Sequence, residues 1–208
     1  MLREQVCKKC RRAGEKLFLK GERCNSPKCA MVKRNYPPGI HGQKGYSRMS
    51  GFAVHLKEKQ KIRYIYGLTE TQLANYMRKA LKKKGNTSEL FLQSLERRFD
   101  NIVFRLGFAR SRAEARKTIT HGHFLINDKK VNIPSYLLRP KDKITLAAKS
   151  AKNKLFSEIL KSADKQKTAD WLSFDKTSHQ GEVLHLPTQK DLNLGFQTQL
   201  VVEFYSNG

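Results

Sequence analysis

Residues 97–140 read RRFDNIVFRLGFARSRAEARKTITHGHFLINDKKVNIPSYLLRP, and they are the most informative stretch of the chain. Its first signal is Asp100, whose carboxylate suits an orphan backbone N–H group and therefore predicts the N-cap of a short helix. Gly107 then occupies the place after a helix end that favours a left-handed residue. Together the two residues predict one short helix.

A second helix follows, and it concentrates positive charge. Ser111 and Glu114 have the spacing of a capping box, and Gly122 is expected to end the helix. Arg112 and Arg116 stand four residues apart on it, and such a like-charged pair destabilises a free helix by roughly 0.2–0.5 kcal/mol. A bound phosphate reverses the sign of that interaction, so the crowding predicts a polyanion as partner. The side chains of this cationic region are Arg110, Arg112, Arg116, Lys117, His121 and His123.

Beyond the second helix the apolar residues alternate with period two. Phe124 and Ile126 therefore share one face of a predicted strand. We expect residues 127–130 to make a turn, after which Val131 resumes the strand, and residues 140–142 to turn the chain into a further strand. The quoted stretch thus predicts two short helices and a small antiparallel sheet.

The whole chain is strongly basic. Its 208 residues include 42 Lys and Arg against 18 Asp and Glu, which gives a net charge of +24. Such self-repulsion favours a negatively charged partner. Residues 155–208 are the exception, with five basic and seven acidic side chains, and we expect them to pack on protein.

Two absences bear on location. No apolar run reaches the roughly 18 residues that a membrane helix needs, and the opening residues MLREQVCKKC contain no secretory apolar region. We therefore expect a soluble, cytoplasmic protein with no membrane partner.

The four cysteines of the chain all lie near its start. They are Cys7, Cys10, Cys24 and Cys29, so the intervals hold two, thirteen and four residues. Two close pairs at this separation are typical of four thiolates around one tetrahedral ion, with no position left open for catalysis. Zn²⁺ in a structural role is the favoured interpretation. An iron–sulfur cluster also accepts four thiolates, and two disulfides would form only in an oxidising compartment.

Residues 30–50 are predicted to be a loop, because prolines and glycines recur between positions 37 and 45. Four basic side chains decorate it, and a histidine stands between its glycines. These residues are Lys33, Arg34, His41, Lys44 and Arg48.

Helices are predicted between this loop and the quoted stretch. Residues 51–66 look helical, with Leu56, Lys59 or Gln60, and Arg63 spaced along one side and a Lys-rich side opposite. Thr69 and Gln72 form a capping box, and the helix that they start is stopped by Gly85. Asn86 begins a further helix whose leucines are expected to lie in the core.

At this point the chain resembles a known family. The quoted stretch looks like the RNA-binding module named after ribosomal small-subunit protein four. The resemblance to that ribosomal protein extends over nearly the whole chain, through KGERCNSPKCAM, PPGIHGQK, LKEKQKIRYIYGL, KKKGNT and the terminal VVEFYS. Matches this long and in this order are specific.

The resemblance implies a function without catalysis. Members of the family bind small-subunit rRNA at a multi-helix junction, nucleate assembly, and influence decoding accuracy beside small-subunit protein five. Their loop side faces the mRNA entry tunnel, where Lys44 and Arg48 would lie. The predicted rRNA-binding residues are Arg11, Arg12, Lys33, Arg34, His41, Arg63, Lys83, Arg98, Arg105, Arg110, Arg112, Arg116, Lys117, His121 and His123.

The resemblance also implies an α+β architecture in which the module is inserted into a mostly helical domain. We expect a four-cysteine metal knuckle and basic loop at 1–48, and a helical domain at 49–95 that is joined by 186–208. The module would occupy 96–185, with its core at 97–160.

Two rival classes of function use similar parts. An RNA-modifying or tRNA-charging enzyme can carry the same module as an accessory, but it needs a large catalytic domain, and the sequence contains no nucleotide-binding glycine loop or nucleophile–base pair. A zinc DNA-binding factor is disfavoured because no helix follows the cysteine pairs at finger spacing. We therefore expect no enzymatic activity and no small-molecule substrate.

Overall fold

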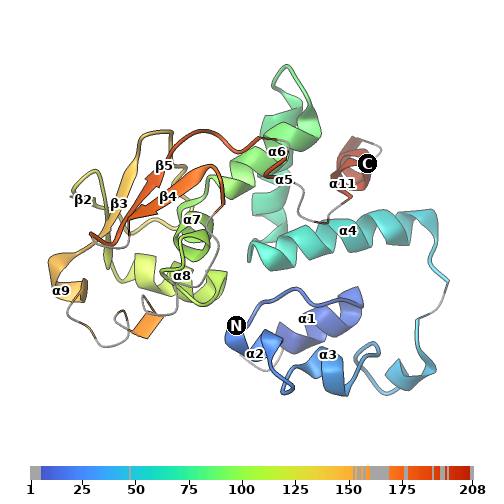
Figure 1. Cartoon of the computed structure of the whole chain (residues 1–208). Coiled ribbons are helices and arrows are strands. Elements are labelled where there is room, and N and C mark those ends of the chain that lie inside the picture. The colour runs from blue at the N-terminus through green and yellow to red at the C-terminus, as the bar shows by residue number, and fades with distance from the viewer. Residues whose placement is uncertain are drawn as a thin grey trace. The chain divides into compact units, whose positions relative to one another are not determined.

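The computed structural model divides the chain into two compact units, Met1–Ser88 with Gly195–Gly208, and Glu89–Leu194 (Figure 1). It describes residues 6–46, 48–151, 153, 156, 158–159, 169–175, 178–188, 190–192, 195 and 197–206. The second unit starts earlier and ends later than the module expected at 96–185. One reason is that the Gln93 side chain donates to the Pro187 carbonyl at 3.2 Å, which ties residues outside both expected boundaries to the same unit.

The N-terminal part of the first unit consists of short helices. They are α1 (Val6–Ala13), α2 (Glu22–Asn25), α3 (Ala30–Lys33) and the 3₁₀ turn η2 (Gly42–Lys44). The segment expected to be a loop therefore contains one helical turn at each end of its proline-rich part. Cys10, Leu17, Cys29 and Met31 belong to a small buried cluster here. Burial in a core this small contributes little stability, so a further stabilising element is expected in this segment.

Three longer helices complete the first unit: α4 (Gly51–Ile65), α5 (Glu70–Leu81) and α11 (Thr198–Ser206). The predicted helix over 51–66 is confirmed, and so is the Thr69–Gln72 capping box, in which both reciprocal hydrogen bonds are formed. α11 packs on α4 although 130 or more residues separate them in the chain, as Figure 1 also shows. α6 (Thr87–Glu96) begins where Asn86 accepts from the Ser88 N–H and leads into the second unit.

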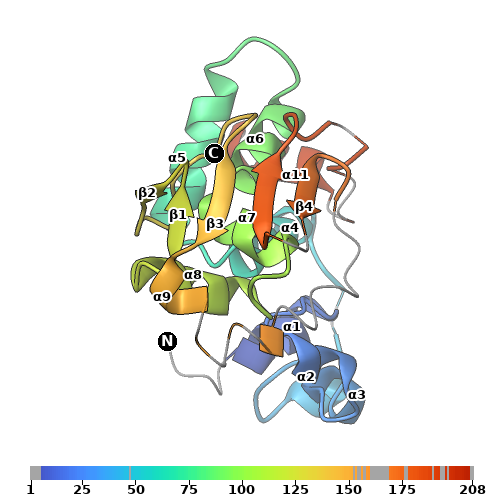
Figure 2. The ribbon, with the colours of Figure 1, turned by 60° about the vertical axis from the view of Figure 1, so that its left-hand side comes forward.

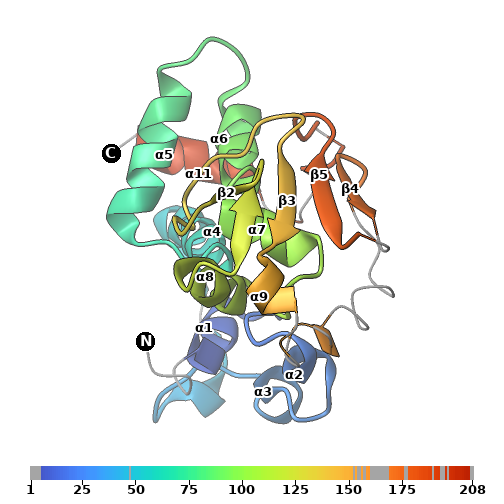
Figure 3. The same ribbon diagram turned by 90° about the vertical axis from the view of Figure 1, so that its left-hand side faces the viewer.

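The second unit is an antiparallel sheet covered by helices. Its described helices include α6 from Glu89 onward, α7 (Phe99–Arg105), α8 (Arg112–Thr120) and α9 (Ala148–Ala151). Its strands are β1 (Phe124–Ile126), β2 (Lys129–Lys130), β3 (Lys143–Leu146), β4 (Leu172–Asp175) and β5 (Gln180–Val183). They pair in the order β2-β1-β3-β5-β4, every pair antiparallel (Figures 2 and 3). The α+β class is thereby confirmed, with a β4–β5 hairpin that the sequence had not predicted.

Buried apolar residues of α7 and α8 share one core cluster with those of the sheet, and Figure 2 shows both helices on one face of it. The Phe124 ring of β1 meets Phe99 and Phe108 edge to face, at centroid distances of 6.1 and 5.5 Å. On β5, a Cβ at Gly181 would collide with the buried Leu106 side chain, so glycine allows the strand to approach the end of α7.

Two local predictions were wrong. Asp100 is not the N-cap of α7, because the cap is Arg98 and the Asp100 carboxylate binds the Arg98 guanidinium instead. The turn after β1 is also shorter than expected. Asn127 and Asp128 have φ of 47° and 64°, which is the two-residue hairpin geometry that asparagine and aspartate favour. The lysines that follow therefore belong to β2, and Val131 lies outside a strand.

Candidate RNA interface and four-cysteine site

The cationic helix α8 begins with a variant of the predicted capping box. The Ser111 hydroxyl accepts from the Glu114 N–H at 3.3 Å. The Glu114 carboxylate accepts from the N–H of Arg110 at 2.8 Å, one residue before the position that a standard box would use. These two hydrogen bonds fix the backbone of the turn before α8 and of its first residues, so the Cα positions that carry the basic side chains are fixed as well.

Arg112 is fixed by a buried partner. Its Nε donates to Asn101 Oδ1 at 2.8 Å, and its guanidinium lies 4.6 Å from the centroid of the Phe104 ring. Asn101 is fully buried and donates through Nδ2 to both the carbonyl and the carboxylate of Glu96, each at 2.9 Å. Arg112 therefore rests on a fixed part of α7.

Arg116 lies one turn further along α8 and is 41% exposed. Its Nη1 is 3.8 Å from Asp100 Oδ2. The Asp100 carboxylate is itself buried and binds Arg98 at two points, 3.0 and 2.6 Å. Arg98 is only 1% exposed. Its predicted RNA contact therefore does not fit the structure, in which this arginine holds Asp100 in the interior.

The end of α8 brings the two histidines and the β1–β2 hairpin together. His123 Nδ1 is 2.8 Å from Ser150 Oγ, and the His123 ring packs edge to face on Phe156. Burial lowers the pKa of His123, and the neighbouring His121 and Lys130 lower it further. The Lys130 side chain lies against Gly122. Lys130 belongs to the basic run of this stretch, and the two-residue turn sets its position on this surface.

Two further predicted contacts are engaged within the protein. Arg105 pairs with the buried Glu96, and Arg63 donates to Glu70 at 3.0 Å. Both guanidinium groups therefore already have an anionic partner.

Arg11 has a structural role in the first unit. Its Nε and Nη2 donate to the carbonyls of Tyr36 and Pro37 at 2.9 and 3.0 Å, and its guanidinium stacks 4.6 Å from the Tyr36 ring. In addition, the Tyr46 hydroxyl donates to the Arg11 carbonyl at 2.6 Å. Arg11 therefore fastens the proline-rich loop to α1.

Most of the remaining predicted residues lie on the surface. Those of the first unit are exposed and bring their charge to solvent. They are Arg12, Lys33, Arg34, His41, Lys44, Arg48 and Lys83. In the second unit the exposed members of the set are Arg110, Lys117 and His121.

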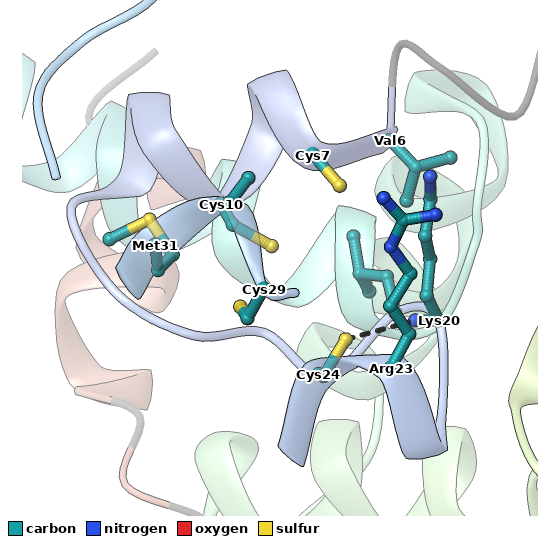
Figure 4. Close-up of a pocket in the computed structure, with 10 residues that line it drawn as sticks. Val6, Cys7, Cys10, Lys20, Arg23, Cys24, Cys29 and Met31 are labelled. Atoms are coloured by element: carbon teal, nitrogen blue, oxygen red, sulfur yellow. Dashed lines mark hydrogen bonds between the residues drawn. The ribbon is translucent and has the colours of Figure 1, made fainter. Parts of the chain in front are cut away.

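The four cysteines gather around one pocket, although they come from three elements. Figure 4 shows the sulfur atoms of Cys7 and Cys10 on α1, Cys24 on α2 and Cys29 before α3 around the same space. Cys24 Sγ accepts from the N–H of Lys20 at 3.3 Å. Burial raises the pKa of Cys10, and the nearby Cys24, Cys7 and Cys29 raise it further.

A pocket of four soft donors fits Zn²⁺ or an iron–sulfur cluster in chemistry and in number. All four thiols are free in the structure. Within the part of the chain that the structure describes, however, no three His, Cys, Asp or Glu side chains stand in a ready-made metal-binding geometry. The thiols would have to rotate toward a bound ion.

Comparison with known proteins matches two consecutive segments of the chain to two family descriptions. Residues 1–96 match the family described as the ribosomal protein S4/S9 N-terminal domain, and residues 97–144 match the S4 domain. Small ribosomal subunit protein uS4 of Thermus thermophilus is 52% identical over 201 residues, which cover 97% of this chain and 96% of the relative. The chain belongs to the uS4 family.

Other uS4 proteins are similarly close. That of Syntrophobacter fumaroxidans is 50% identical over 98% of this chain and 97% of its own length, and that of Geotalea daltonii is 49% identical over 96% of each. The S4-domain match covers α7, α8 and the first three strands, and it ends within β3. The β4–β5 hairpin thus extends the sheet beyond the part that the domain description covers. No helix among the described residues is long and apolar enough to cross a membrane.

Proposed function

We propose that the protein is a structural constituent of the small ribosomal subunit that binds rRNA through the cationic face of α8. The observation that carries this assignment is the Arg112–Arg116 pair, held on an S4-type helix by buried partners in a uS4-family chain. Arg110 and Lys117 extend the positive charge over the exposed surface nearby, and His121 is exposed there as well.

Binding would rest on phosphate and shape recognition. The deep groove of A-form RNA excludes side chains, so a folded RNA junction presents backbone phosphates and 2′-hydroxyls to a protein. Guanidinium groups suit this task because their forked donors match phosphate oxygens. Each phosphate that the protein neutralises adds roughly −0.7 to −0.9 to the slope of log affinity against log salt concentration.

The finer assignments follow from the family resemblance. We propose a multi-helix rRNA junction as the primary site, an early role in subunit assembly, and an influence on decoding accuracy beside small-subunit protein five. Lys44 and Arg48, both exposed, are proposed to face mRNA at the entry tunnel. We assign no catalytic role and no small-molecule substrate.

The four cysteines are proposed to hold a structural metal, with Zn²⁺ favoured over an iron–sulfur cluster. Support comes from the shared pocket, the small core around it, and the N–H group of Lys20 that already donates to the Cys24 sulfur. Bound metal would draw α1, α2 and α3 together, because each helix or its cap supplies at least one thiol.

The experiment that tests RNA binding compares wild type with the Arg112→Ala, Arg116→Ala double variant. Filter binding to Thermus thermophilus small-subunit rRNA over a range of KCl concentrations should give weaker binding and a flatter salt slope for the variant. The Lys82→Ala, Lys84→Ala double variant, at exposed positions outside the predicted set, is the control that also loses two cations. An unchanged affinity and slope in the arginine variant would contradict the proposed interface.

A further inference from the structure

We propose that Asn101 is a positioning residue for RNA binding, which holds the Arg112 guanidinium in the orientation that meets a phosphate. The proposal rests on the function proposed above, and it adds a residue that never touches RNA. Asn101 lies in α7, is fully buried, and contacts Arg112 through its side-chain oxygen at 2.8 Å.

The orientation of Asn101 is itself determined. Its Nδ2 donates to the Glu96 carbonyl and to Glu96 Oε2, both at 2.9 Å. These donor bonds decide which end of the amide is nitrogen, so Oδ1 must point toward Arg112. Glu96 is fully buried as well and also binds Arg105. The amide thus has a single orientation that satisfies its neighbours.

The contact with Asn101 restrains the Arg112 guanidinium at its Nε atom. A hydrogen bond at Nε fixes the plane of the guanidinium, and the Phe104 ring at 4.6 Å supports one face of that plane. An arginine side chain otherwise has many rotamers, and immobilising them on binding weakens affinity by about two- to tenfold. Asn101 would lower that loss before RNA arrives.

The amide is also the right chemical group for this task. A carboxylate at the same place would cancel the arginine charge that RNA binding needs, whereas an amide oxygen accepts a hydrogen bond and adds no charge. The adjacent Asp100 differs because its carboxylate is bound by Arg98 at two points, and it reaches Arg116 only at 3.8 Å. Two consecutive residues of α7 thus serve two arginines of α8 in different ways.

A double-mutant cycle on the full-length protein tests the proposal. Its members are wild type, Asn101→Ala, Arg112→Lys and the double variant, with Thermus thermophilus small-subunit rRNA as the probe. Lysine keeps the charge of Arg112 but has no Nε for Asn101 to hold. Each single variant should bind about two- to tenfold more weakly, the range that one immobilised side chain represents. The salt slope should stay unchanged because no phosphate contact is lost.

The coupling between the two sites separates positioning from stability. If Asn101 acts through Arg112, the double variant binds no more weakly than the weaker single variant. Thr118→Val is the matched control, since its buried hydroxyl donates only to carbonyls within α8, at 2.9 and 3.2 Å. This control should lower stability without lowering rRNA affinity.

Several results would overturn the proposal. Additive losses in the double variant, or an equal loss in Thr118→Val, would assign Asn101 a structural role only. If Asn101→Ala fails to fold, as judged by circular dichroism, Arg112→Lys decides alone, and wild-type affinity for it overturns the proposal. Failure of the proposed function is distinguishable, because then the Arg112→Ala, Arg116→Ala variant keeps both its affinity and its salt slope.

Discussion

The Tyr205 hydroxyl donates to the Glu70 carboxylate at 3.1 Å and thereby connects residues that are 135 positions apart in the chain. Lys59 and Arg63 of α4 donate to the same carboxylate at 2.7 and 3.0 Å. One acidic side chain at the start of α5 therefore binds α4 and α11 together. Burial and the negative charge of Glu70 raise the pKa of Tyr205, so its hydroxyl stays a donor.

The Glu70 contacts predict a pH dependence of stability. Burial alone would raise the pKa of Glu70, but the hydrogen bonds from Lys59 and Arg63, the charge of Lys59 and the hydrogen bond from Tyr205 outweigh it and hold the pKa below its ordinary value of 4.5. Because the folded pKa is depressed, this stabilisation is present above the ordinary pKa and is lost as the pH falls through the folded value.

Glu70→Gln should therefore lower the free energy of unfolding at pH 7 and have a smaller effect in acid. The carboxylate side chain is 43% exposed, which limits the loss to about 1 kcal/mol. Urea unfolding at pH 7 and pH 3, with Tyr205→Phe as the variant that keeps both ion pairs, would measure it. An equal loss at both pH values would count against this assignment.

Arg11 is predicted to order the proline-rich loop. Arg11→Lys keeps the charge but cannot donate to the Tyr36 and Pro37 carbonyls as a planar fork. We expect hydrogen exchange at residues 36–46 to become faster by about fivefold or more, since a lost pair of hydrogen bonds represents about 1 kcal/mol or more. Arg12→Lys, at the exposed neighbouring position, should leave the exchange rate unchanged. Equal rates in both variants would exclude the fastening role.

Metal removal is predicted to loosen the first 33 residues. Chelation should increase proteolysis of α1–α3, and Cys10→Ser should have the same effect because it removes a buried ligand. Elemental analysis and the visible absorption spectrum would identify the metal, since Zn²⁺ is colourless and an iron–sulfur cluster is not. Ser26→Ala, within the same segment but outside the sulfur pocket, is the control. A proteolysis pattern that chelation leaves unchanged would show that no metal stabilises this segment.

Gly181 is predicted to be required for the packing of β5 on α7. In Gly181→Ala the new methyl group would collide with the Leu106 side chain, and overpacking of this kind costs roughly 1–3 kcal/mol. Thermal unfolding should show the loss. Gly51→Ala, where the new Cβ meets no atom within 4 Å, should not destabilise the protein. Equal stability of the two variants would mean that β5 can shift away from α7.

The helices and the strand that have local sequence signals were predicted correctly from the sequence. Thr69 and Gln72 predicted the start of α5, and Ser111 with Gly122 predicted the limits of α8, because caps depend on residues within one turn. The alternation of Phe124 and Ile126 likewise predicted β1. The family resemblance, carried by long ordered matches, predicted the uS4 relationship that the comparisons confirmed.

The tertiary structure was needed to show which basic side chains face solvent and which form ion pairs within the protein. Arg98 has an acidic residue two positions later, as a surface arginine can have, and only the packed α7 shows it buried against Asp100. Asn101 carries no sequence signal for its contact with Arg112, since the two residues meet across a helix–helix packing. The β4–β5 hairpin was missed for a related reason: its strands are short, and β5 pairs with residues of β3 that lie 37 to 39 positions earlier in the chain. Side-chain pairing depends on burial and on partners distant in the chain, and the spacing of neighbouring residues predicts neither.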